Sequence, residues 1–303
     1  LFRLVGSEMC IRDRCLAADS KIFFAPAMNQ AMWKDKRTKK NLASLKLPIF
    51  IQIGPNEGDQ ACGDIGPGRM SEPKEIIEIV GKEFSSGLLA GKKILITAGP
   101  TREKIDPVRY ISNKSSGKMG FSLAKAAMEE SAIVQLITGP VNLETPERVS
   151  RINVESAQEM CEKVIESIPE IDLFISTAAV SDFKMKDIKK NKIKKEDRKS
   201  FNLELEKNED ILKLVSKDNP ELKIVGFAAE TENLIDNAKK KLISKKLNLI
   251  VANDVSDSSI GFDSDENEVF LISEKEELKI AKTSKEKVSR KIIQFISKNI
   301  LDD

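Results

Sequence analysis

Past residue 91, short continuous apolar runs alternate with amphipathic segments along the chain. KKILIT at 92–97 and DLFIST at 172–177 are two such runs. Apolar runs of this length, bounded by polar residues, predict strands that are buried on both faces. Further strands of this kind are expected at 133–138, 223–228, 248–252 and 268–272.

The segments between these runs predict helices. Residues 118–130 place their apolar side chains on one helical face, and Ser156 with Glu159 forms a capping box that opens another helix. Two more helices are expected at 233–244 and 284–299. Buried strands separated by amphipathic helices predict an α/β fold with a Rossmann-like, mainly parallel sheet. Such sheets bind ligands at the carboxyl ends of their strands.

The first part of the chain has a different pattern. Between residues 20 and 70, apolar runs at 22–26 and 48–53 are separated by polar and glycine-rich stretches. The apolar positions of 72–82 predict a helix that closes a domain. The glycines and small residues of 83–91 then predict a linker.

Residues 1–14, LFRLVGSEMCIRDR, do not look like part of either domain. They resemble translated sequencing adapter, and the other reading is a genuine terminus of irregular sequence. We therefore expect non-native sequence at 1–14, one domain at 15–82, a linker at 83–91 and a second domain at 92–303.

Composition excludes several classes of protein. Fifty Lys and Arg against 48 Asp and Glu give a net charge of +2, so no nucleic-acid partner is expected. No apolar run approaches the roughly 20 residues that cross a bilayer, so no membrane association is expected. The four cysteines are scattered, without CxxC spacing, which favours a cytoplasmic location. The sequence has no histidine, which excludes histidine-based acid–base chemistry.

The loop after the first strand of the second domain is the strongest candidate site. The strand runs into Gly99, and Ser115, Ser116, Gly117 and Lys118 then stand at the start of the next helix. Backbone N–H groups and the helix dipole favour an anion at such a position, and the hydroxyls and the lysine add to it. This pattern favours phosphate binding, and an ordinary turn between strand and helix is the alternative.

A nicotinamide-dependent dehydrogenase is a second function that fits a loop of this kind. That class places an acidic residue at the end of the second strand, where it binds the ribose. Here the strand 133–138 runs directly into Gly139 and Pro140. The dehydrogenase reading is therefore disfavoured.

The sequence AGPTREKIDPVRYISNKSSGKMG at 98–120 closely resembles the signature of phosphopantothenate–cysteine ligases, one of the two activities of bacterial bifunctional coenzyme A biosynthesis proteins. Four further segments continue the resemblance in order along the chain: STAAVSD at 176–182, KIKK at 192–195, VGFAAET at 225–231 and ANDV at 252–255. The resemblance covers nearly all of 91–303.

The resemblance implies a reaction in two steps. The carboxylate of 4′-phosphopantothenate attacks the α-phosphate of CTP and releases pyrophosphate, and the amine of cysteine then displaces CMP from the acyl-cytidylate. It also implies a homodimer. Mg²⁺ is expected with the nucleotide because it shields triphosphate charge, and no all-protein metal cage is visible in the sequence, so the metal ligands stay unknown. The choice of CTP over ATP follows from the resemblance alone.

Two residues match catalytic positions of the family. Lys192, with Lys194 and Lys195 beside it, matches the essential lysine, and it is suited to neutralise the triphosphate. A solvated charge run is the alternative reading of this loop. Asn113 matches the asparagine that turns over the acyl intermediate, and a turn-forming asparagine is its alternative.

The resemblance also implies a set of binding residues. Those for the nucleotide are Ser176, Thr177, Ala178, Asp182, Lys192, Glu209, Asp210, Ile211, Leu212, Phe227, Lys241 and Lys245. The residues of the phosphate-binding loop, Ser115, Ser116, Gly117 and Lys118, are expected to bind the substrate. Lys241 and Lys245 are four residues apart on one helical face and are expected to meet at one ligand. Asn208-Glu-Asp210 departs from the usual Asn-Pro-Asp, which should loosen that turn without abolishing binding.

The front domain resembles the C-terminal part of a flavodoxin-like flavoprotein decarboxylase. PAMNQAMW at 26–33 matches the motif whose asparagine, here Asn29, binds the substrate carboxylate beside FMN. ACGD at 61–64 matches the substrate-clamp loop, whose cysteine, here Cys62, protonates the product. A thiol with a pKa near 8.5 can donate a proton at neutral pH. A lone cysteine in a glycine-rich loop would otherwise be read as inert.

The decarboxylase fold normally spans far more residues than precede the linker here, and the missing part carries the catalytic histidine and most FMN contacts. We therefore expect no decarboxylation by this polypeptide and weak or no FMN binding. A complete bifunctional protein represented by a fragmentary sequence is an alternative. A non-catalytic nucleotide-binding remnant is another, and the presence of Asn113, Asp182 and Lys192 argues against it.

Overall fold

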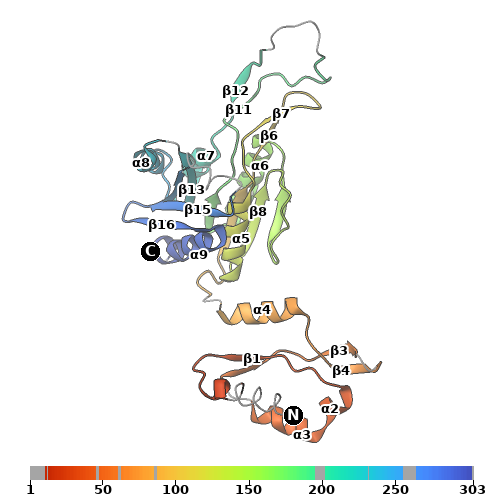
Figure 1. Ribbon diagram of the computed structural model, residues 1–303. Coiled ribbons are helices and arrows are strands. Elements are labelled where there is room, and N and C mark those ends of the chain that lie inside the picture. The colour runs from red at the N-terminus through yellow and green to blue at the C-terminus, as the bar shows by residue number, and fades with distance from the viewer. Residues whose placement is uncertain are drawn as a thin grey trace. The chain divides into compact units, whose positions relative to one another are not determined.

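An eight-stranded sheet forms the centre of the second of two units, which comprise Leu1–Ser85 and Ser86–Asp303 (Figure 1). The computed structural model describes residues 11, 13–45, 48–60, 63–84, 87–194, 202–230, 232–254 and 264–301. The strands of the sheet, in spatial order, are β16 (Glu277–Ser284), β15 (Glu266–Ile272), β14 (Leu249–Asp254), β13 (Lys223–Glu230), β10 (Leu173–Ser176), β5 (Lys93–Ala98), β8 (Ile133–Thr138) and β9 (Ser150–Asn153).

The sheet is mainly parallel, as the sequence predicts. From β9 to β14 every neighbouring pair of strands is parallel, whereas β15 is antiparallel to β14 and to β16. The chain builds β5, β8 and β9 towards one edge and then returns to place β10 on the other side of β5. The sheet therefore reverses its order between β5 and β10.

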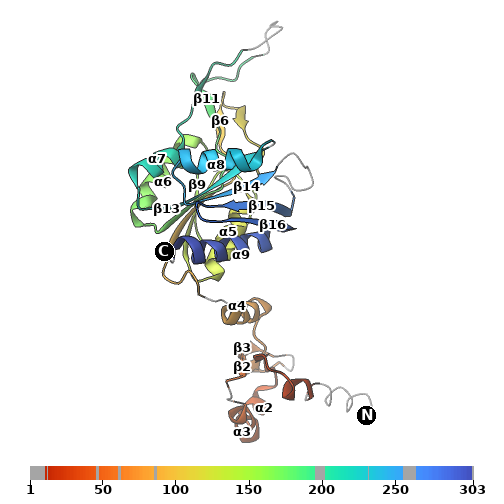
Figure 2. The same ribbon diagram turned by 90° about the vertical axis from the view of Figure 1, so that its left-hand side faces the viewer.

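Helices cover both faces of the sheet (Figure 2). α5 (Lys118–Glu129) and α9 (Lys285–Ile296) pack on one face, and α6 (Ala157–Ser167), α7 (Ile211–Asp218) and α8 (Leu234–Ser244) pack on the other. Ile94 and Ile96 of β5 belong to the first core and Leu95 to the second. The alternation of side chains along a strand thus feeds two separate hydrophobic layers.

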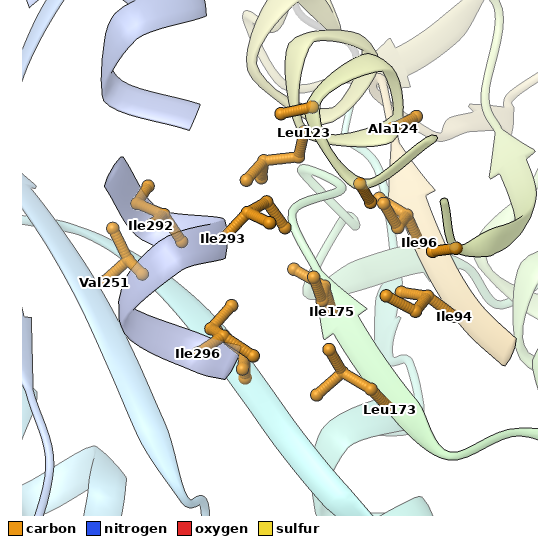
Figure 3. Close-up of a cluster of buried hydrophobic side chains, with 14 of the residues drawn as sticks. Ile94, Ile96, Leu123, Ala124, Leu173, Ile175, Val251, Ile292, Ile293 and Ile296 are labelled. Atoms are coloured by element: carbon orange, nitrogen blue, oxygen red, sulfur yellow. The ribbon is translucent and has the colours of Figure 1, made fainter. Parts of the chain in front are cut away.

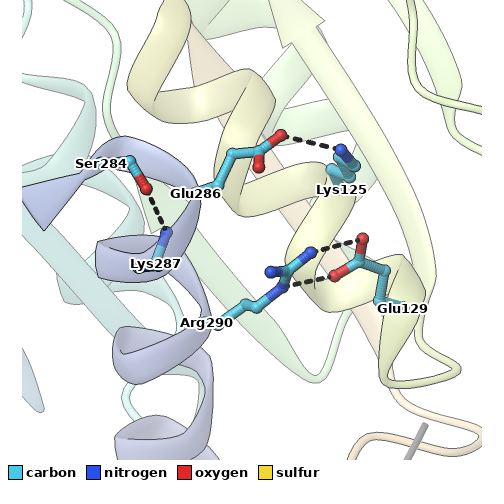
Figure 4. Close-up of polar contacts among 6 residues, drawn as sticks. All are labelled: Lys125, Glu129, Ser284, Glu286, Lys287 and Arg290. Carbon is cyan, nitrogen blue, oxygen red and sulfur yellow. Dashed lines mark hydrogen bonds and ion pairs between the residues drawn. The ribbon is translucent and has the colours of Figure 1, made fainter. Parts of the chain in front are cut away.

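The α5–α9 layer combines a dry core with charged pairs at its rim. Ile293 of α9 lies beside Leu123 of α5 inside the core, and both are fully buried (Figure 3). At the rim, the Arg290 guanidinium donates to both carboxylate oxygens of Glu129, at 2.9 and 3.1 Å (Figure 4). Half of the Arg290 side chain is exposed. Ion pairs that solvent reaches contribute little, so burial holds these helices together.

The predicted N-cap at Ser156 is confirmed, and the reciprocal bond of the capping box is shifted by one residue. The Ser156 hydroxyl accepts the N–H of Glu159 at 3.2 Å, and the Glu159 carboxylate accepts the N–H of Glu155 at 2.7 Å. The bond from the Glu159 carboxylate therefore ends at Glu155, the residue that precedes the N-cap. Several elements were not predicted: β9, β16, α7, the hairpin of β6 (Arg102–Lys104) with β7 (Tyr110–Ser112), and the hairpin of β11 (Phe183–Met185) with β12 (Leu205–Lys207).

The first unit has far fewer buried residues than the second among those that the structure describes. β1 (Ile22–Phe24) pairs in parallel with β2 (Phe50–Gln52), and β3 (Asn56–Asp59) pairs with β4 (Ile65–Arg69) in a hairpin. The helices are α2 (Gln30–Lys34), α3 (Lys36–Ser44) and α4 (Pro73–Phe84). Among the residues described before 85, Ile53, Gly68 and Ser71 alone are buried.

The segment expected as a linker, 83–91, divides between the units. Glu83 and Phe84 belong to α4, whereas Leu89 is fully buried in the α5–α9 core. None of the helices in the described ranges is long and apolar enough to span a membrane.

We predict that Ile293→Ala lowers the free energy of unfolding of the second unit by about 2–5 kcal/mol, because it leaves a cavity in the α5–α9 core. Arg290→Gln, one turn away on the same helix, should lower it by no more than about 1 kcal/mol. Urea unfolding followed by circular dichroism compares the two variants. An equal or larger loss for Arg290→Gln would show that the ion pair, not burial, holds α9.

Candidate active site

A cavity of about 480 Å³ opens at the carboxyl ends of β5 and β10, where the order of the sheet reverses. Loops that leave two such strands turn away from each other, so a space remains between them. The predicted site residues that line it are Asn113, Ser115, Ser116, Gly117, Lys118, Ser176, Thr177, Ala178, Asp182, Glu209, Asp210, Ile211, Leu212, Phe227 and Lys245. Most of the predicted ligase site therefore comes together in one place.

One wall of the cavity is formed by the loop that leads from β5 to the start of α5. Gly117 is the N-cap of α5 and has a φ of 76°, a conformation that favours glycine. Gly120 allows α5 to lie against the sheet, because a Cβ there would lie 2.5 Å from the Cβ of Ala98 and from the Oγ1 of Thr177. The first N–H groups of α5 therefore lie at the cavity, where they favour an anion.

Asn113 connects the two walls. Its Nδ2 donates to the carbonyl oxygens of Ala179, at 3.3 Å, and of Val180, at 3.0 Å. Both acceptors belong to the loop after β10 and lie more than sixty residues away in sequence. The amide thus fixes a contact between loops, which goes beyond the local turn that was its alternative reading.

The segment 208–212 is held without the family's proline. Asn208 donates its backbone N–H to Asp182 O at 2.9 Å and its Nδ2 to Ser181 O at 2.8 Å. Asp210 caps α7 by accepting the N–H of Lys213 at 3.1 Å. These bonds fix the turn that the sequence Asn-Glu-Asp was expected to loosen.

Lys241 and Lys245 do not meet at one point of the cavity. Lys245 lines it and pairs with Asp210, with Nζ and Oδ2 2.7 Å apart. Lys241 instead pairs with Glu230 at the end of β13, with Nζ and Oε1 2.7 Å apart, and is not among the lining residues. The four-residue spacing placed both lysines on one side of α8, but the position of the two carboxylates separates their ammonium groups.

Lys192 is exposed and also stands outside the lining of the cavity. Its loop is tied down on both sides, because Lys189 donates its N–H to Ile105 O at 3.0 Å and Ile193 donates its N–H to Asp106 Oδ2 at 3.1 Å. Lys195 lies outside the described residues.

The far side of the cavity includes residues that the sequence did not single out. Asn253 lies one residue before the end of β14, within the ANDV motif, and Asn267 of β15 and Lys285 of α9 are only 4% and 6% exposed. Nearby, Lys118 pairs with Asp265, with Nζ and Oδ1 2.7 Å apart. The hydrogen bond from Lys118, with its charge, lowers the pKa of the Asp265 carboxyl. Only Asn253 carried a signal, the end of a parallel strand.

In the first unit, the two decarboxylase-like motifs lie next to each other. Asn29 caps α2 by accepting the N–H of Ala31 at 2.7 Å, and its Nδ2 donates to Asp64 at 3.2 Å. Gly68 lies so close to this motif that a Cβ there would be 2.1 Å from Met28 O. Cys62 lies outside the described residues. In the described ranges, no group of three or more Cys, Asp or Glu could hold a metal ion.

Two family models match the chain. One, described as DNA/pantothenate metabolism flavoprotein C-terminal domain, matches residues 89–300, and the other, described as Flavoprotein, matches residues 9–85. The second match spans the unit that contains Asn29, and the first spans the whole cavity.

Curated relatives and solved structures agree with these matches. The chain is 47% identical over 281 residues to the coenzyme A biosynthesis bifunctional protein CoaBC of Vibrio parahaemolyticus, covering 92% of this chain and 70% of that protein. It is 47% identical over 284 residues to its counterpart from Haemophilus influenzae, with 93% and 70% covered. A crystal structure of the C-terminal domain of a CoaBC protein aligns with a TM-score of 0.62 and 41% identity, covering 72% of this chain and 100% of that one.

The sequence motifs and the sheet that reverses its order at the cavity agree with the comparisons. The similarity to these proteins extends over about nine-tenths of this chain. The chain belongs to the family of bifunctional coenzyme A biosynthesis proteins.

Proposed function

We propose that the second unit joins 4′-phosphopantothenate to cysteine at the expense of CTP. The observation that carries this proposal is the single cavity that brings Asn113, the 115–118 loop, Asp182 and the 209–212 segment together. An anion-binding helix start, cationic side chains and a polar amide at one site fit a reaction between a carboxylate and a nucleoside triphosphate.

In the first step, a carboxylate oxygen of phosphopantothenate forms a bond to the α-phosphorus of CTP. The bond from that phosphorus to the bridging oxygen breaks, and pyrophosphate leaves with the electron pair. The N–H groups at the start of α5, with Lys118 and Lys245, line the cavity and would neutralise phosphate charge. Lys192 adds a further cation from the neighbouring loop.

In the second step, the amine nitrogen of cysteine forms a bond to the acyl carbon and gives its proton to water. The bond from that carbon to the phosphate oxygen breaks, and CMP leaves with the electron pair. Asn113 is held at the cavity wall by two carbonyl oxygens of the facing loop, so it can orient the acyl group without competing as a nucleophile. The chain contains no histidine, so no imidazole takes up the proton that the amine loses.

Mg²⁺ fits this chemistry because it shields triphosphate charge. The described residues contain no cluster of carboxylates that could hold it alone. The phosphates of the nucleotide would supply most of the ligands of Mg²⁺. Asp182, in the loop after β10, lines the cavity and could add a carboxylate ligand.

We predict that Lys192→Gln lowers pyrophosphate release from CTP with phosphopantothenate by about 100-fold or more, because it removes a cation that stabilises transition-state charge. Lys190→Gln, on the same exposed loop, is the matched control and should stay within about 2-fold of wild type. Parallel assays with ATP test the choice of nucleotide. An unchanged rate in Lys192→Gln would make the loop a solvated charge run, equal losses in both variants would remove the special role of Lys192, and no release by the wild type would favour the non-catalytic remnant.

We predict that Asn113→Ala slows the second step more than the first, so that acyl-cytidylate accumulates. The amide that spans the two loops is lost, and the acyl group is no longer oriented. Rapid quench with labelled CTP should show a burst of pyrophosphate and about 10-fold to 100-fold slower CMP formation. Asn219→Ala removes a comparable bond, from Nδ2 to Val215 O at the end of α7, outside the cavity. Its two steps should match the wild type, and a similar accumulation there would refute the role of Asn113.

We further propose that this 303-residue polypeptide does not decarboxylate phosphopantothenoylcysteine, although Asn29 and Asp64 lie together in the first unit. It contains no histidine, and the strands described before residue 85 form only two-stranded sheets. We predict no release of CO₂ from phosphopantothenoylcysteine with added FMN, measured against a full-length relative. Measurable turnover would overturn this proposal and leave the ligase proposal intact.

A further inference from the structure

The short turn between β6 and β7 holds the loop of Lys192 by hydrogen bonds at two residues. Asp106 Oδ2 accepts the backbone N–H of Ile193 at 3.1 Å, and the Arg109 guanidinium donates to the carbonyl oxygen of Ile193 at 3.3 Å. Four residues earlier, the N–H of Lys189 reaches Ile105 O at 3.0 Å. The backbone that carries Lys192 is therefore fixed on both sides of the lysine, by a turn more than eighty residues away in sequence.

The Asp106 carboxylate divides its two oxygens between two tasks. Oδ1 accepts the N–H groups of Val108 at 2.8 Å and Arg109 at 2.9 Å, which folds the turn itself. Oδ2 accepts Ile193 and lies 3.5 Å from the Arg109 guanidinium. The side chain is fully buried. One oxygen therefore builds the turn and the other holds the lysine loop.

Asp106 is ionised in this position. Burial is the largest single influence and raises the pKa of the carboxyl, but three backbone N–H groups and Arg109 together outweigh it and lower the pKa below its ordinary value. A buried carboxylate costs free energy unless hydrogen bonds compensate it. A charged group that reaches across to Ile193 makes a stronger hydrogen bond than a neutral one.

The same turn also leads to Asn113. β7 follows it directly, and Ser112 at the end of β7 donates its hydroxyl to Thr101 O at 2.8 Å. Asn113 then bridges to the loop after β10. The loops that carry the two candidate catalytic side chains, Asn113 and Lys192, are thus both connected to the turn between β6 and β7.

We propose that Asp106 is a positioning residue that holds the Lys192 loop in register with Asn113. The inference rests on the proposed ligase function. A long lysine side chain on an untethered loop would lose much conformational entropy when it engages the phosphates. Fixing its backbone at Lys189 and Ile193 removes part of that loss before the nucleotide binds, and places the cation for the step that releases pyrophosphate.

Asp106→Asn separates this role from a purely structural one. The amide keeps one oxygen, which can still accept Val108 and Arg109, but its nitrogen cannot accept the N–H of Ile193. Glu103→Gln is the matched control, because Glu103 is 4% exposed and its Oε1 accepts the N–H of Ala157 at 2.9 Å, away from the lysine loop. Ile193→Pro removes the donor from the other partner and leaves the buried carboxylate in place.

We predict that the Ile193 amide of the full chain exchanges its hydrogen about 10-fold faster in Asp106→Asn than in wild type. The kcat for pyrophosphate release should fall by about 10-fold to 100-fold while the KM for CTP changes by less than about 3-fold. Ile193→Pro should lose a similar factor in kcat, and the double variant should lose no more than either single variant, because both break one contact. Glu103→Gln should leave exchange at Ile193 and kcat unchanged.

Unchanged exchange at Ile193 in Asp106→Asn would overturn the proposal, and so would additive losses in the double variant. Equal losses of kcat in Glu103→Gln would reduce Asp106 to a structural residue. If Asp106→Asn does not fold, an unchanged kcat in Ile193→Pro would overturn the proposal by itself. A wild-type protein that releases no pyrophosphate would refute the ligase proposal instead, and exchange at Ile193 would still decide whether Asp106 holds the loop.

Discussion

The hydrogen bonding of β5 to β8 on one side and to β10 on the other is the constraint on which the site depends. Because the chain completes one side of the sheet before it begins the other, the loops after β5 and β10 leave neighbouring strands in different directions. The cavity is the space between them. Gly120 then decides how closely α5 approaches, and so where its first N–H groups lie. The order of the strands creates the cavity, and the loops contribute the polar and charged residues that line it.

Loops in this position need bonds that connect them, because loop backbone has few partners of its own. Asn113 ties the first loop to the second, Asn208 ties the second to the start of α7, and Asp106 ties the first to the loop of Lys192. Each bond joins a short polar side chain to backbone atoms that are distant in sequence. The site is therefore a set of loops fixed to one another, which suits a reaction that depends on orientation more than on acid–base chemistry.

The sequence predicted the parts of the fold whose side chains are uniform in character. The buried strands were found because both of their faces are apolar, as in β5, where five of six residues are buried. β16 escaped because Ile280 alone is buried along it, and β12 because all of its residues are exposed. An edge strand or a projecting hairpin exposes one or both of its faces to solvent, so its pattern of polar residues resembles that of a loop. Asn267 and Lys285 escaped although their elements were predicted, because β15 and α9 reach the cavity from the antiparallel edge of the sheet.

Sequence spacing also could not show that three of the predicted site lysines have carboxylate partners. Lys118, Lys241 and Lys245 each have a carboxylate oxygen 2.7 Å from Nζ, supplied by Asp265, Glu230 and Asp210. Such pairs hold long side chains in place at modest cost, since solvent weakens each of them. A triphosphate carries more charge than any one carboxylate and offers several acceptor oxygens, so it can displace these partners or share the lysines with them.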